Sequence, residues 1–70
     1  DMIGLDQALE RMKALDTGLY ELIEMVGFAG LSIAEVAEVR GLSTRSINRE
    51  LLKARALLQE LLGDPPNSTY

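Results

Sequence analysis

The chain of 70 residues contains neither cysteine nor histidine. A chain without cysteine forms no disulfide and no thiolate metal site. A chain without histidine also lacks the commonest metal ligand and the side chain that normally titrates near neutral pH. These absences remove the usual starting points for catalysis, so we expect no enzyme, no cofactor, no bound metal and no small-molecule substrate.

Long apolar runs and targeting signals are absent as well. No apolar run approaches the length of about 18 residues that a membrane span needs, and the chain does not open with a basic and then apolar leader. We therefore expect a soluble, cytoplasmic protein with no membrane partner. Because Asp1 stands where a methionine would begin a chain, we also expect a fragment of a longer protein.

The length and hydrophobicity of the chain set its size class. Seventy residues make one small domain of modest stability, and 47% hydrophobic residues suffice for a core if the elements are regular helices. The predicted fold class is all-α, a small four-helix domain. Its expected parts are a leader or linker remnant at residues 1–4, the domain itself at residues 5–62 and a flexible tail at residues 63–70.

Apolar residues spaced by three and four predict the helices. The first segment carries one apolar stripe, formed by Leu5, Ala8, Leu9 and Met12. The second segment repeats the pattern until Gly27 and Gly30 weaken it. The predicted helices run from Leu5 to about Leu15, from Asp16 or Thr17 to about Gly27, from Ile33 to about Arg40, and from the Ser43 cap to about Leu62.

Capping residues support the third and fourth of these helices. Ser32 and Glu35 have the spacing of a capping box, in which each side chain takes a backbone N–H of the other residue. Gly41 can adopt the left-handed conformation that ends a helix, and Ser43 can cap the next one. Two helices joined by a short turn are therefore predicted across residues 32–62.

The segment from Leu31 to Leu58 has the spacing of a helix-turn-helix. Such a motif needs a small residue where the helices touch, a glycine where the chain reverses and a branched apolar anchor on the second helix. Ala37, Gly41 and Ile47 fill these three roles. A DNA-reading module formed by helices three and four is therefore the leading hypothesis.

The last helix has one apolar side and one polar side. Its predicted buried seam consists of Ile47 and of four residues within about 40° of it around the axis: Leu51, Ala54, Leu58 and Leu61. Arginine and asparagine on the opposite side are residues that read guanine and adenine edges in the major groove. The predicted DNA contacts are Ser43, Thr44, Arg45, Asn48, Arg49, Leu52 and Lys53.

Charge is unevenly distributed along the chain. The net charge is −4, yet residues 40–55 hold five basic residues and one acidic residue, a net +4, which leaves −8 on the rest. A basic segment on an acidic body is typical of a nucleic-acid-binding face. A solvated helix surface with charges of both signs is the alternative explanation.

Taken together, these segments resemble a known family. The chain from about Leu5 to Leu62 looks like region 4 of bacterial sigma factors of the extracytoplasmic-function type. The resemblance is carried by the second helix with its glycine-containing exit and by the segments LSIAEVAEVRGLS and SINRELLKARALL. Two features make the match more specific than a generic helix-turn-helix. They are Ala54 and Arg55, seven and eight residues past Ile47, and the Leu15–Asp16 start of the second helix. It implies promoter DNA at the −35 element, the β-subunit flap of RNA polymerase and an anti-sigma protein as partners.

The resemblance also assigns roles to single residues. It places Ile47 at the family's anchoring valine, Asn48 where lysine is common, Arg49 near base- or phosphate-contacting positions and Arg45 in the variable reading segment. The sequence departs from the family pattern at three places. Thr17 and Gly18 stand where the family often has proline and arginine, and Met25 and Val26 stand where it has leucine and arginine. Leu52 occupies a position that is commonly basic. Two backbone-contacting arginines are thereby missing, which predicts weak DNA binding by the isolated domain.

Two other functions compete with the sigma-factor interpretation. One is the DNA-binding output domain of LuxR-class response regulators, in which the fourth helix usually forms a dimer contact. The other is a helical protein-interaction module that has lost DNA binding. Met25 and Phe28, near the exit of the second helix, are expected to fill the core, with a protein-docking spot as the alternative.

Overall fold

The computed structural model describes residues 4–63 of the chain. Its helices are α1 (Leu5–Leu15), α2 (Thr17–Ile23), a π-helical turn η1 (Glu24–Phe28), α3 (Ile33–Arg40) and α4 (Thr44–Leu61). The described part contains no strand, so the predicted all-α fold with four helices is confirmed. Residues 1–3 of the predicted leader and 64–70 of the predicted tail lie outside the described residues.

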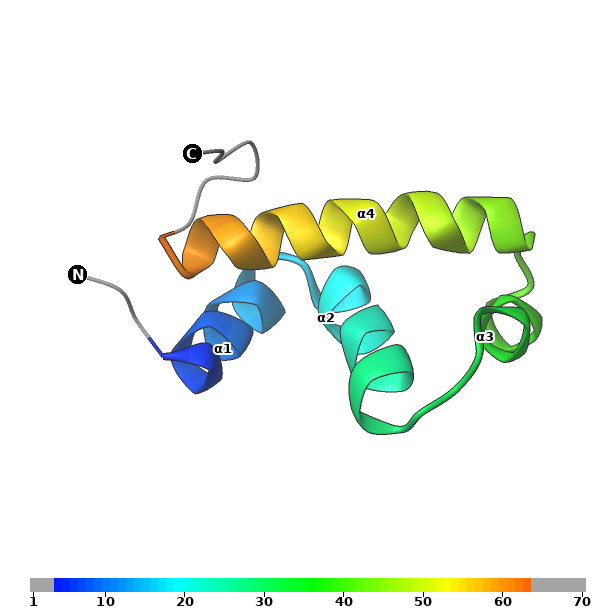
Figure 1. The fold of residues 1–70 in the computed structure, drawn as a ribbon, viewed down its shortest axis with the longest axis horizontal. Helices are drawn as coiled ribbons and strands as arrows, with labels where there is room; N and C mark the ends of the chain where they lie inside the picture. Colours follow the sequence, from blue (N-terminus) through cyan, green and yellow to red (C-terminus); the bar gives the residue numbers. More distant parts are fainter. Residues whose placement is uncertain (1–3, 64–70) are drawn as a thin grey trace, which may run out of the picture.

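The long helix α4 organises the molecule. It runs along one side, α1 and α2 pack beneath it one after the other, and α3 lies at its N-terminal end (Figure 1). Within residues 4–63 no helix combines the length and the apolar character required to cross a membrane.

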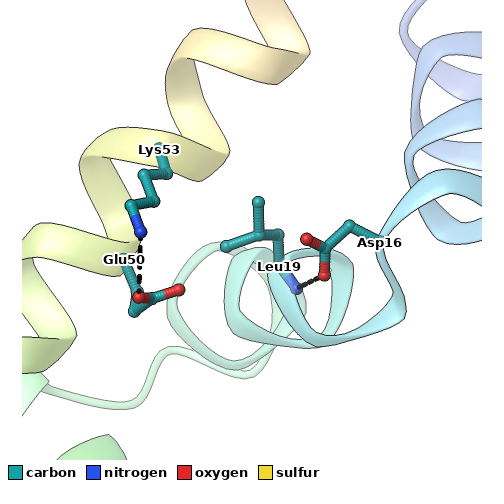
Figure 2. Close-up of polar contacts among 4 residues, drawn as sticks. All are labelled: Asp16, Leu19, Glu50 and Lys53. Carbon is teal, nitrogen blue, oxygen red and sulfur yellow. Dashed lines mark hydrogen bonds and ion pairs between the residues drawn. The ribbon is translucent and has the colours of Figure 1, made fainter.

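Side-chain caps fix where the helices begin. The Asp16 carboxylate accepts a hydrogen bond from the Leu19 backbone N–H at 3.1 Å, which starts α2 (Figure 2). Ser32 and Glu35 form the predicted capping box, with the two hydrogen bonds at 3.1 and 2.8 Å. Caps of this kind stabilise a helix by about 1 kcal/mol each because they satisfy backbone donors that have no partner inside the helix.

Gly41 ends α3 as the sequence predicted. Its φ of 69° and ψ of 34° are left-handed, and the Leu42 N–H donates to the Ala37 carbonyl at 2.9 Å, the hydrogen bond that closes a Schellman motif. A Cβ atom built on Gly41 would meet nothing within 4 Å. The glycine is therefore required by its backbone angle and not by a lack of space for a side chain.

The core is small and apolar. Its largest cluster consists of Leu22, Val36, Ala37, Ile47 and Leu51, joined by partly buried residues of α2, η1 and α3. Ala8, Met12 and Ala54 are also buried, and no polar side chain is buried in the described part of the chain. Because each large apolar side chain contributes about 1.5–3 kcal/mol on burial, a core of this size stabilises the domain only modestly.

The predicted seam of α4 is confirmed over its first half. Ile47, Leu51 and Ala54 are buried, whereas Leu58 and Leu61 are only half-buried. Of the other helices, only α1 lies beneath the C-terminal end of α4 (Figure 1), so a single helix covers this part of the seam. Leu5, expected in the stripe of the first helix, is 51% exposed because it begins that helix, at the edge of the fold.

The second helix departs from the prediction at its end. The Ala29 N–H donates to the Glu24 carbonyl at 2.8 Å, a spacing of five residues that makes η1 a π-helical turn. The Leu31 N–H then reaches the Met25 carbonyl at 2.9 Å, across Gly30 at φ 74°. The helix thus continues one residue past Gly27, and it is Gly30 that reverses the chain.

Candidate nucleic-acid interface

The α3–α4 pair is compatible with the predicted helix-turn-helix. The three residues from Gly41 to Ser43 join the helices, and the second helix follows with Ile47 fully buried against Leu22, Val36 and Ala37. An anchor buried on one side of α4 leaves the opposite side of the same turns facing solvent. The buried anchor therefore fixes which side of α4 faces solvent.

Most of the predicted contact residues of α4 lie on this surface. Arg45, Asn48, Arg49 and Leu52 are exposed there, and Thr44 is exposed in the first turn of the helix. Within residues 4–63, neither Arg45 nor Arg49 has a carboxylate within 4.0 Å. Their like charges, four residues apart, cost the free helix about 0.2–0.5 kcal/mol. A polyanion bound at this face would remove that cost.

Ser43 is engaged within the protein. Its Oγ accepts a hydrogen bond from the Ser46 backbone N–H at 3.1 Å, and its hydroxyl donates to the Ser46 Oγ at 3.1 Å. The hydroxyl proton and one acceptor position are thus used to begin α4. Ser43 sets where α4 begins, and its predicted contact with DNA remains a prediction.

Lys53 is also partly engaged. Its ammonium lies 3.6 Å from a Glu50 carboxylate oxygen one turn back on α4, and Figure 2 shows the lysine side chain folded along the helix onto this partner. Both groups remain accessible to water, so the ion pair contributes little to stability. It nevertheless offsets part of the positive charge that the sequence assigned to this face.

Leu52 is the unusual member of the set. Its side chain is 66% exposed in the middle of α4, beside the charged residues of the outer face. An isolated exposed leucine needs no special explanation in a folded protein. On a DNA-reading helix, its methyl groups suit an apolar contact with a thymine methyl.

Arg40, which the sequence counted with the basic segment, lies elsewhere. It is the last residue of α3, it is half-buried, and its guanidinium donates to the Gly18 carbonyl in the first turn of α2 at 3.0 Å. Sequence reasoning missed this contact because the two residues are 22 positions apart. The basic segment is therefore not a single continuous surface.

A second surface feature lies on α2 and η1, outside the predicted site. Glu21, Glu24, Met25, Phe28 and Ala29 line an open hollow of about 470 Å³. Met25 is half-buried and packs against the core, as predicted, but Phe28 is 65% exposed, so the prediction that it fills the core is wrong. The hollow therefore combines apolar side chains with two carboxylates.

Tyr20 contributes a polar contact beside this region. Its hydroxyl donates to the Glu24 carboxylate at 3.1 Å. This hydrogen bond, partial desolvation and the negative charges of Glu24 and Glu10 raise the pKa of Tyr20 above its usual value. The Lys13 ammonium lies 5.6 Å from the centre of the tyrosine ring, within the range of a cation–π contact. These contacts join α1, α2 and η1.

The carboxylates of this region do not form a metal site. Among the described residues no group of three or more acidic, histidine or cysteine side chains is placed to hold a metal ion. Paired glutamates on a helix, such as Glu21 and Glu24, are solvated surface in this arrangement.

Comparison with protein families identifies the chain at the level of family. The model of the ECF sigma factor family matches residues 1–64. Among curated proteins no match is found, and no solved structure matches either. The family match agrees with the resemblance read from the sequence and favours it over the LuxR-class alternative.

Proposed function

The chain belongs to the ECF sigma factor family, whose members are non-enzymatic factors of transcription initiation, and we propose that it binds the −35 promoter element through the outer face of α4. The family assigns RNA polymerase and promoter DNA as the general partners.

One observation carries the proposal. Arg45, Asn48 and Arg49 are exposed on two successive turns of α4, directly after the turn that joins it to α3, and on the side opposite the buried Ile47. A helix with its side chains is about 10–12 Å across and fits a major groove about 12 Å wide. Arginine can bind guanine and asparagine can bind adenine through two hydrogen bonds at once.

The test separates folding from DNA binding. Replacing Arg45, Asn48 and Arg49 together by alanine removes groups that contact nothing in the core, so the thermal melt is expected to change little. Promoter binding in a competition titration is expected to be lost, at about 1–3 kcal/mol for each base contact removed. If the triple variant still selects the same promoter, α4 does not read it through these residues.

We further propose that the hollow on α2 and η1 binds protein, either the β-subunit flap of RNA polymerase or an anti-sigma protein. The support is the exposed aromatic side chain of Phe28 next to the half-buried Met25 in this hollow, which no residue of α4 lines. An aromatic side chain of this kind is a common anchor at protein interfaces.

A matched pair of variants tests this docking surface. Phe28→Ala is expected to weaken binding to RNA polymerase or the regulator by at least tenfold while leaving DNA affinity unchanged. Val39→Ala is the control because Val39, on α3, is 67% exposed and lies outside the hollow. Equal effects of the two variants would show that the hollow is not the docking surface.

A further inference from the structure

One hydrogen bond stands apart from the other side-chain contacts of the domain. In the described part of the chain, the ion pair and all other side-chain hydrogen bonds join residues three or four positions apart. The bond from the Arg40 guanidinium to the Gly18 carbonyl spans 22 positions. Within residues 4–63 it is therefore the only side-chain hydrogen bond that joins residues far apart in the sequence. Apolar packing otherwise holds the core together.

This hydrogen bond lies at the end of the fold that α3 occupies. The non-helical residues 29–32 lead from η1 to α3, and α3 sits at one end of α4 (Figure 1). The inner side of α3 packs through Val36 and Ala37, but Val39 on its outer side is 67% exposed. Packing on a single side restrains a short helix less than packing on several sides, and the Arg40 hydrogen bond adds a restraint at the C-terminal end of α3.

Arg40 is also the last residue before the turn into α4. Gly41 follows it directly in the left-handed conformation, and Ser43 begins α4 two residues later. A restraint on Arg40 is thus a restraint on the point from which α4 starts. Because α2 packs against α4 as well, the bond closes a loop of contacts from α2 through α3 and the turn back to α4.

We propose that Arg40 is a positioning residue for DNA binding. Its guanidinium holds the α3–α4 turn in the geometry that presents the outer face of α4, and it does not contact phosphate. This inference rests on the proposed promoter binding. A domain whose turn is already held in the bound geometry loses less conformational freedom on binding, so its affinity for the correct site is higher.

The substitution Arg40→Gln tests the role because glutamine ends about two bonds short of the guanidinium and cannot reach the Gly18 carbonyl. Promoter affinity is expected to fall about three- to tenfold, the range for one lost hydrogen bond, while affinity for random-sequence DNA changes less than twofold. Arg55→Gln is the control, since it removes the same charge from an exposed position of α4 outside the predicted contacts. Both measurements are made well below the melting temperature of each variant.

The salt dependence of binding distinguishes positioning from phosphate contact. If Arg40 positions the turn, the slope of log affinity against log salt concentration is the same for Arg40→Gln as for Arg55→Gln. If Arg40 contacts a phosphate, the slope becomes shallower by about 0.9, as expected for Arg49→Gln, and the proposal is wrong. An equal loss of promoter and random-sequence affinity would also overturn it, because that result describes a purely structural residue.

A measurement without DNA separates this inference from the proposed function. Hydrogen exchange of the α3 backbone amides in the free protein is expected to be about three- to tenfold faster in Arg40→Gln than in Arg55→Gln, with the α1 amides unchanged. If the α3 amides exchange at the same rate in Arg40→Gln and Arg55→Gln, Arg40 does not restrain α3, and the proposal is wrong even if the domain binds its promoter. If the wild-type domain shows no promoter preference, promoter binding fails and the positioning role in DNA binding fails with it, whatever the exchange shows.

Discussion

Replacing Leu52 by arginine gives opposite results for the two functions that remain open to this chain, a DNA reader and a protein-interaction module. Leu52 lies on the outer side of α4 with 66% of its side chain exposed, so the substitution removes little buried surface. Arg49 and Arg55 stand three residues before and after it. Each like-charge pair costs the helix about 0.2–0.5 kcal/mol, so we expect a loss of stability of at most about 1 kcal/mol.

On DNA we expect the same substitution to be favourable. An arginine here adds a phosphate contact, which steepens the salt dependence by about 0.9, or a guanine contact, which is worth about 1–3 kcal/mol. If Leu52 is instead an anchor in an apolar pocket of a protein partner, the buried guanidinium weakens that complex by several kcal/mol.

The assay is a pair of titrations of the same variant, one with promoter DNA and one with RNA polymerase or a co-purifying regulator. Leu52→Gln is the control, because it removes the apolar side chain without adding charge. Tighter DNA binding by Leu52→Arg, with an unchanged protein complex, supports a DNA-reading α4 and excludes docking through Leu52. If Leu52→Arg binds promoter DNA no more tightly than the wild type, Leu52 does not face the DNA groove in the complex.

Three further predictions concern the turn, the charge and Tyr20. Gly41→Ala is expected to destabilise the domain by about 1–2 kcal/mol in thermal melting, because only its left-handed φ is unfavourable for a side chain; an unchanged melt would contradict the helix-turn-helix placement. Random-sequence DNA is expected to bind with a Kd of about 10⁻⁵ M or weaker near physiological salt, and fluorescence titration at two salt concentrations should show the affinity falling as salt rises. The Tyr20 hydroxyl is a donor to Glu24 only while protonated, and its pKa is raised in the folded state. Its stabilising contribution is therefore complete below about pH 10 and lost as the pH rises through the folded pKa, so the melting temperature of the wild type should fall more than that of Tyr20→Phe in this range.

The sequence predicted those features of the fold that depend on neighbouring residues. Asp16, Ser32 and Ser43 cap helices because each carries an acceptor within reach of a backbone N–H two or three residues later, and Gly41 ends α3 because it tolerates a positive φ. The anchor Ile47 followed from helical periodicity. All of these depend on spacing along the chain, which a sequence displays directly.

Features that depend on how the helices meet were not predicted. The five-residue hydrogen-bond spacing in η1 has no side-chain signature, and the pattern of apolar residues gave no sign that Phe28 would lie at the surface. The contact between Arg40 and Gly18 requires the packed positions of α2 and α3, which no local pattern contains. The exposed positions of the predicted DNA contacts on α4 followed from periodicity, whereas their actual contacts with DNA remain a prediction.

These internal contacts change how the basic segment should be counted. Of its five cations, Arg40 donates to a backbone carbonyl and Lys53 lies beside Glu50, which leaves Arg45, Arg49 and Arg55 as exposed cations without an ion pair in the described part of the chain. Arg45 and Arg49, the two of these that are predicted DNA contacts, correspond to a salt slope of about −1.8, against about −4.5 if all five cations contacted phosphate. We therefore expect the domain to have little general attraction for DNA, so that under the proposed function its choice of promoter depends on base contacts from α4.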